Sequence, residues 1–254
     1  MDESFKWRHY ESDIILQCVR WYCKYGISYR DLEEMMKERG VEVNHTTIYR
    51  WVQTYGPEIE QRIRQYTRYS HYGSWHVDGT YIKVKGQWKY LYRAVDREGK
   101  TIDFMLLHSR SLRAATQFLK RTLRLRHHPK NSIYTDKAPS YISAITDLKA
   151  MKKLKPHMRH RQSKYMNNSI EADHSRIKKV TNPTRGFKTF ASARSTLKGI
   201  EAMQMIRKKQ PYPISWSNKI TEAQFVLSLF EEKKSMSLIS ESISDECGVS
   251  LSKF

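Results

Sequence analysis

Cysteine is scarce in this sequence, and long apolar runs are missing from it. Only Cys18, Cys23 and Cys247 occur among 254 residues, too few for a disulfide framework, which predicts a reducing cell interior. No apolar run approaches the roughly 20 residues that a membrane-spanning helix needs. Residues 1–4 also lack the basic and then apolar pattern of a signal peptide. We therefore expect a cytoplasmic location.

Acidic residues are few in the middle of the chain. Residues 71–210 hold 9 Asp and Glu against 31 Lys and Arg, while residues 1–70 balance at zero. This excess gives the chain its net charge of +20 and predicts a surface that follows phosphates, where released counterions contribute to affinity. A membrane surface is the rival partner, but no basic helix has a clean apolar face. Aromatic residues make up 12% of the chain, which excludes disorder of the whole.

Residues 1–66 are predicted to form three helices, the second capped by Ser28 and the third preceded by Asn44. We expect the third helix to end at Gly56 and Pro57. Two short helices joined by a glycine-containing turn are typical of a helix-turn-helix DNA-binding domain, although a plain three-helix bundle has the same pattern. The outer face of the third helix carries side chains suited to base edges and phosphates. These are His45, Thr46, Thr47, Tyr49, Arg50 and Gln53.

From residue 75 the apolar period changes to two, which indicates strands. Strands are predicted over 75–84, 87–95, 101–107 and 132–135, with helices over 113–125, 141–154, 168–180 and 191–208. An antiparallel meander followed by a helix and a further, parallel strand defines an α/β domain over 70–210. Residues 211–254 are interpreted as a C-terminal extension, partly disordered, because seven serines lie in 235–254.

Three of the rare acids stand out by position. Asp78 lies inside a strand, where aspartate is depleted, and Asp136 follows the strand 132–135, at the end where α/β sheets present ligand-binding groups. If the two strands pair in parallel, these carboxylates become neighbours. Glu171 opens a helix. Carboxylates gathered in a basic groove repel one another unless a divalent cation joins them, and hard oxygen ligands favour Mg²⁺. A turn at Asp136, a capping box at Glu171 and an ion pair at Asp78 remain the structural alternatives.

The acids recur in the order Asp78, Asp136, Glu171, with 34 residues between the last two. This order, together with several local stretches, resembles the DDE transposases of bacterial insertion sequences, above all the sixth insertion-sequence family, which is replicative and forms cointegrates. The resembling stretches are 20–30, 47–52, 75–78, 90–96, 135–139, 167–174 and 199–203.

The resemblance implies an RNase H-like (retroviral-integrase-like) catalytic domain preceded by an all-α helix-turn-helix domain. It implies Asp78, Asp136 and Glu171 as catalytic ligands of two Mg²⁺ ions, with Mn²⁺ able to substitute, and Lys178 as a DNA-binding residue. The expected partner is double-stranded DNA, both the terminal inverted repeats and the target. The expected assembly is a homodimer or higher oligomer on DNA, associated with the nucleoid. Gly79 departs from many members, which carry an acid there.

Two other classes of function remain open. A non-enzymatic helix-turn-helix protein, or an inactive transposase copy, would not depend on the acids, but the neutral charge of residues 1–70 disfavours DNA contact confined to that segment. A structure-selective nuclease on the same fold would hydrolyse DNA without preference for an end sequence. A zinc protein is disfavoured, because the four histidines at 127, 128, 157 and 160 lack cysteine or carboxylate partners at ligand spacing.

Overall fold

The computed structural model of the chain separates into two compact units, one made of 1–68 and 195–254 and the other of 69–194. The structure describes Phe5 and residues 9–67, 73–124, 129, 131–162, 168–182, 186–211 and 220–231. Cys247, the histidines at 127 and 128 and residues 212–219 and 232–254 of the C-terminal extension lie outside these residues. None of the described helices is long and apolar enough to cross a membrane.

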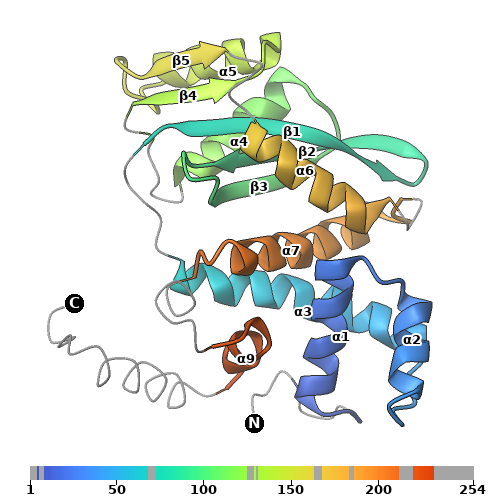
Figure 1. Cartoon of the computed structure of the whole chain (residues 1–254). Coiled ribbons are helices and arrows are strands. Elements are labelled where there is room, and N and C mark those ends of the chain that lie inside the picture. Colours follow the sequence, from blue (N-terminus) through green and yellow to red (C-terminus); the bar gives the residue numbers. More distant parts are fainter. Residues whose placement is uncertain are drawn as a thin grey trace, which may run out of the picture. The chain divides into compact units, whose positions relative to one another are not determined.

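The helical unit is built on three N-terminal helices, as the apolar pattern predicts (Figure 1). Its helices are α1 (Ser12–Tyr25), α2 (Tyr29–Lys37), α3 (His45–Tyr66), α9 (Glu222–Ser228) and, from Ser195 on, α7 (Phe190–Arg207). The expected cap residues are confirmed. The Ser28 Oγ accepts a hydrogen bond from the Asp31 N–H at 3.1 Å, and the Asn44 Oδ1 accepts one from the Thr46 N–H at 2.9 Å.

Helix α3 corrects one expectation, because it does not end at Gly56 and Pro57 but continues to Tyr66. A Cβ atom at Gly56 would lie 3.4 Å from the Gly199 Cα of α7, so the glycine allows the two helix backbones to approach closely. Buried Ile59 further along α3 packs in the same core. This packing outweighs the helix-breaking tendency of Pro57, which removes one backbone donor.

The two cysteines of α1 lie in the core of the helical unit, as expected for small apolar residues. Cys18 and Cys23 are fully buried free thiols. Burial raises the pKa of each thiol to about 12, because the charged thiolate is disfavoured away from water.

The second unit contains a five-stranded mixed sheet in the order β3-β2-β1-β4-β5. Its strands are β1 (Trp75–Val84), β2 (Gln87–Val95), β3 (Thr101–Leu107), β4 (Ser132–Thr135) and β5 (Arg159–Gln162). The first three form an antiparallel meander, and β4 pairs in parallel with both β1 and β5. This topology confirms the expected α/β, RNase H-like fold. The strand β5 was not predicted, since its four residues look like part of a basic loop.

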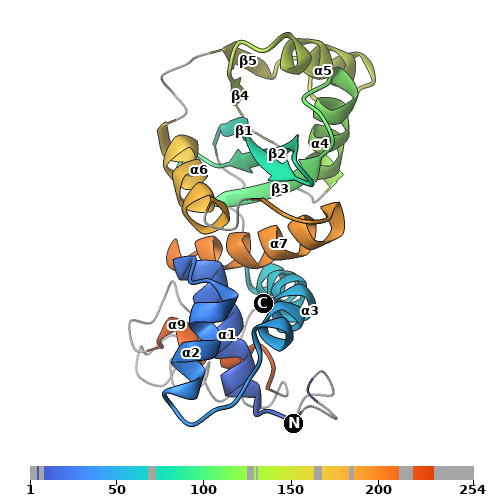
Figure 2. The ribbon, with the colours of Figure 1, turned by 90° about the vertical axis from the view of Figure 1, so that its right-hand side faces the viewer.

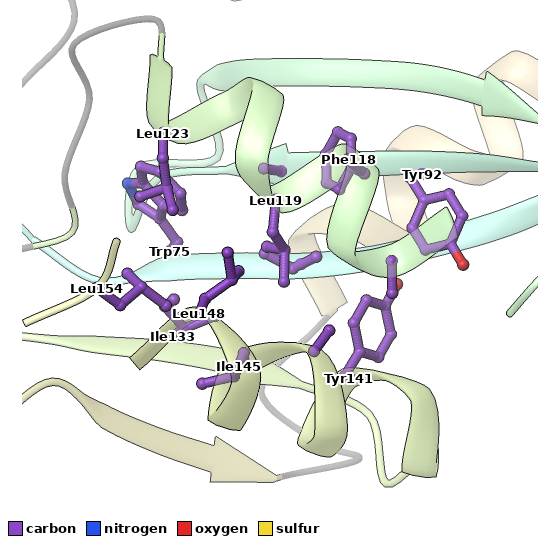
Figure 3. Close-up of a cluster of buried hydrophobic side chains, with 14 of the residues drawn as sticks. Trp75, Tyr92, Phe118, Leu119, Leu123, Ile133, Tyr141, Ile145, Leu148 and Leu154 are labelled. Atoms are coloured by element: carbon purple, nitrogen blue, oxygen red, sulfur yellow. The ribbon is translucent and has the colours of Figure 1, made fainter. Parts of the chain in front are cut away.

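Helices cover both faces of the sheet (Figure 2). Helices α4 (Leu112–Arg124) and α5 (Pro139–Ala150) lie on one face, and α6 (Asn168–Thr181) lies on the other. The main apolar cluster fills the space between the sheet and α4 and α5 (Figure 3). Its members alternate along the strands, as Trp75 and Val77 do in β1, because successive side chains point to opposite faces. Residues of even number in β1, including Asp78, therefore face α6.

Candidate active site

Parallel pairing of β1 with β4 brings the first two candidate carboxylates to one region of the sheet. Trp75 pairs with Ile133 and His76 with Tyr134, so two more residues along the same register lead to Asp78 and Asp136. This pairing confirms the condition on which the expected proximity of the two acids depends. Asp78 is in the interior of β1, and Asp136 directly follows the end of β4.

Asp136 is held by its own loop and by a cation. Its Oδ1 accepts a hydrogen bond from the Ala138 N–H at 3.0 Å, a turn that leads into α5. Its Oδ2 forms an ion pair with the Arg110 guanidinium, which also lies over the Tyr90 ring, 5.4 Å from the centroid. Asp136 is therefore a turn-forming residue as well as a candidate ligand, and for Asp136 to take a cation, Arg110 must move off Oδ2.

Glu171 lies in the first turn of α6 and is exposed. One turn later on the same face, His174 is 7% exposed and its Nδ1 lies 4.0 Å from the Asp78 Oδ2. Burial lowers the pKa of His174 to about 3, and the nearby Arg93 and Lys178 lower it too, so the imidazole is neutral. The Lys178 side chain is exposed a further turn along the helix.

The other two candidate carboxylates act electrostatically on Asp78. Burial is the main reason that the pKa of Asp78 rises from 3.8 to about 6. The Gly79 N–H and Arg110 lower this pKa, whereas the negative charges of Asp136 and Glu171 raise it. Within the described ranges, no three His, Cys, Asp or Glu side chains are arranged to hold a metal ion. The hard oxygen donors and their mutual repulsion nevertheless fit a divalent cation in chemical type.

Gly79, the departure from the family pattern, has a structural reason. A Cβ atom at this position would lie 2.4 Å from the Tyr90 Cε1 and 2.6 Å from the Leu91 carbonyl oxygen. No side chain fits between the two strands without a shift of the β2 backbone. An additional acid next to Asp78 is therefore excluded, and Tyr90 takes the space.

The charge on Asp78 predicts a conflict between stability and function. Because the folded state raises this pKa above 3.8, stability is greatest where the carboxyl is protonated and falls as the pH rises through about 6. Above that pH the ionised group costs at most about 3 kcal/mol. We expect Asp78→Asn to raise the melting temperature of the metal-free protein at pH 8 and to have little effect near pH 4. Thermal unfolding at the two pH values measures this, and an equal shift at both would contradict it.

The helix proposed to read DNA presents most of the expected side chains outward. Gln53 is the exception, because its Nε2 donates to the Thr196 Oγ1 of α7 at 2.9 Å, within the helical unit. His45 faces α2, with its Nδ1 2.7 Å from the Glu33 Oε2. Contact with DNA by this helix stays a prediction. Thr46, Tyr49 and Arg50 are exposed, and His45, Thr47 and Gln53 are half-buried.

Sequence reasoning missed the cations that surround the acids. Arg93 is fully buried in β2, where its Nη1 and Nη2 both donate to the Asp173 Oδ2 at 3.2 Å. Arg93 pairs in register with Asp78. A candidate metal ligand, Asp78, therefore lies directly opposite Arg93, the residue that anchors α6 on the sheet. The available signal was a charged residue inside a strand, together with a second acid two residues after Glu171. Arg110 gave no such signal, since it lies in a loop among many other arginines.

Comparison with known proteins identifies the chain as a DDE-type polynucleotidyl transferase. The family described as "DDE domain" matches residues 72–210. The chain is 42% identical over 205 residues, 81% of its length and 89% of theirs, to Staphylococcus aureus transposases for the insertion sequence-like element IS431mec. The same identity and coverage relate it to the transposase of IS257 in transposon Tn4003, also from Staphylococcus aureus. The chain therefore belongs to the DDE transposases of bacterial insertion sequences, in the sixth insertion-sequence family.

Solved integrase cores also match the chain. The HTLV-2 integrase catalytic core domain in complex with magnesium is 16% identical, with 50% of this chain and 82% of that chain covered and a TM-score of 0.39. The catalytic core domain of BIV integrase is 11% identical, with 65% and 97% covered and a TM-score of 0.37.

Proposed function

We propose that this transposase binds the terminal inverted repeats of its element, cleaves the ends and joins the freed 3′-hydroxyl to target DNA. The observation that supports the proposal is the proximity of the three acids expressed at Asp78, whose pKa is raised by the charges of both Asp136 and Glu171. The surplus of 31 basic over 9 acidic residues in 71–210 suits a polyanionic substrate around that cluster.

The proposed roles follow from side-chain chemistry. Asp78, Asp136 and Glu171 would hold two Mg²⁺ ions, for which Mn²⁺ can substitute. When bound, such ions supply positive charge to the attacking and leaving oxygens of phosphoryl transfer. Lys178 would contact a phosphate from the exposed side of α6, and the outward side chains of α3 would read the repeat. In the joining step the 3′-hydroxyl oxygen attacks the target phosphorus, and the bond from that phosphorus to its 3′-oxygen breaks.

The proposed setting and assembly follow from the reaction. Two element ends must be brought together, so a homodimer or higher oligomer on double-stranded DNA is the working assembly. The substrate places the protein in the bacterial cytoplasm, in association with the nucleoid. No membrane takes part.

The test is a strand-transfer assay with the purified full-length protein, Mg²⁺ and oligonucleotides carrying the element's own end. We expect joined products from the native end and at least about tenfold fewer from an end with scrambled sequence, since each mismatched base pair costs about 1–3 kcal/mol. Equal cleavage of the native and the scrambled oligonucleotide, without joined products, would identify a structure-selective nuclease. End-specific binding without any product would leave a DNA-binding protein or an inactive copy.

A further inference from the structure

The hairpin formed by β1 and β2 exposes two large aromatic side chains. Tyr81 is 50% exposed and Trp88 is 63% exposed. Their rings contact each other edge to face, with centroids 6.4 Å apart and an interplanar angle of 74°. The pair is thus held in a fixed arrangement by the strands rather than projecting from a loop. Such rings are costly to leave in water, which suggests a partner.

A continuous line of contacts leads from this pair to the acids. The centroids of the Tyr81 and Tyr90 rings lie 5.1 Å apart. The Arg110 guanidinium lies over the Tyr90 ring and also forms an ion pair with Asp136. Tyr81 pairs in register with Tyr90, so both side chains project from one face of the sheet. Tyr81 thus projects from the sheet face opposite to Asp78, and it connects to Asp136 within the same unit through the buried Tyr90 ring and Arg110.

The charge around the pair indicates the chemistry of the partner. Lys83 and Lys85 are exposed and Lys89 is half-buried, and no acid occurs between Asp78 and Asp96. Lys83 pairs in register with Trp88 and projects from the same face as the two rings, and Lys85 follows in a tight turn with φ values of 49° at Lys85 and 74° at Gly86. Aromatic faces flanked by lysines suit a nucleic-acid strand, because the rings stack on bases while the ammonium groups attract phosphates.

We propose that Tyr81 and Trp88 form a stacking platform for unpaired bases of the DNA strand that reacts at the carboxylate site. The inference rests on the proposed function and specifies the form of DNA that the site takes. In an intact duplex the base faces are stacked on one another and only their edges and the backbone are accessible. Stacking on the platform thus requires bases that are unpaired near the reacting phosphate, as at a frayed or distorted element end.

Binding measurements on the full-length protein test the platform directly. Fluorescence anisotropy without divalent cations would compare a fully paired element end with the same end carrying three unpaired bases. Stacking on an aromatic residue contributes about 1–3 kcal/mol per base, so Trp88→Ala should weaken binding of the unpaired end by about tenfold or more. Binding of the paired end should change by less than about twofold. Trp88→Phe should retain most of the affinity, whereas Trp88→Leu, which keeps apolar bulk, should not.

Matched controls decide between the possible outcomes. Tyr25→Ala removes an aromatic of similar exposure, 49%, from the helical unit and should leave the discrimination unchanged. Equal loss on both DNA forms, or none on either, would overturn the platform. So would a Trp88→Ala protein that dissociates into monomers during sedimentation, since the hairpin would then be an interface between two copies. If the wild type prefers the unpaired end but yields no joined product, the platform stands and the proposed function fails.

Discussion

Asp136→Asn is expected to abolish joined products in the strand-transfer assay, lowering the rate by on the order of 1,000-fold or more. Metal-ion catalysis supplies several kcal/mol to phosphoryl transfer, and every 1.4 kcal/mol is a factor of ten in rate. Asparagine keeps the volume and the carbonyl oxygen that accepts from the Ala138 N–H, so the turn before α5 should persist. What it lacks is the negative charge that pairs with Arg110 and would hold a cation.

An acid on the helix that follows Asp136 provides the control for this variant. Asp147 lies on α5 in the same unit, away from the carboxylate cluster, and Asp147→Asn should keep wild-type activity within about twofold, as surface changes usually do. Thermal unfolding of both variants checks that each is folded. Joined products from Asp136→Asn within tenfold of the wild type would remove Asp136 from the proposed site.

Arg93→Met should strongly destabilise the second unit, lowering the free energy of unfolding by about 3–5 kcal/mol. Arg93 is completely buried and Asp173 is 2% exposed. Methionine fills part of the space but removes the buried cation from the Asp173 carboxylate, which keeps the exposed Arg176, whose Nη1 donates to the Asp173 Oδ1 at 3.2 Å. Urea denaturation of the metal-free protein measures the loss.

A double variant separates the charge effect from packing. Arg93→Met combined with Asp173→Leu removes both charges, and such replacements of buried ion pairs by apolar groups are often neutral or stabilising. We expect it to recover most of the lost stability. Lys100→Met, which breaks the exposed pair with Glu98, should cost less than about 1 kcal/mol. A single variant at Arg93 that costs no more than this control would contradict the argument.

The Arg93–Asp173 pair has a role beyond stability. The pair fixes α6 on the sheet at Asp173, between Glu171 and His174. The position of the third candidate carboxylate, Glu171, therefore depends on Arg93 of β2. The double variant should therefore fold while holding Glu171 less firmly. Its activity should stay below that of the wild type even where its stability is restored.

Four of the five strands of the second unit, β1 to β4, could be predicted from the sequence with their full bounds. Alternation of apolar and polar residues, together with β-branched and aromatic side chains, is a local signal, and β1 to β4 carry it strongly. β5 does not carry it, since Arg159 and Arg161 lie at a charged edge and the strand depends on backbone pairing with β4. Helix α3 passes Gly56 and Pro57 for a similar reason, because its continuation depends on contact with distant α7.

In the candidate site, too, features with a local sequence signal could be predicted and features that depend on distant contacts could not. Asp78, Asp136 and Glu171 could be selected because acids are rare in a basic segment and each lies at a structurally informative position. Their surroundings could not be, because Arg110 and Arg93 reach the acids only through the folded sheet. An individual arginine among many gives no local sign of its partner. The sequence alone therefore indicates the candidate reactive acids but not the arginines that position them.

The two buried thiols of α1 offer a built-in way to measure how often the helical unit opens. Cys18 and Cys23 are inaccessible and held as neutral thiols in the folded state, so reagents that require a thiolate cannot react with them until the helices separate. In a background with Cys247 replaced by serine, the labelling rate of the remaining cysteines would report each opening event of this unit. Opening of this unit could thus be compared with and without DNA by using its native thiols alone.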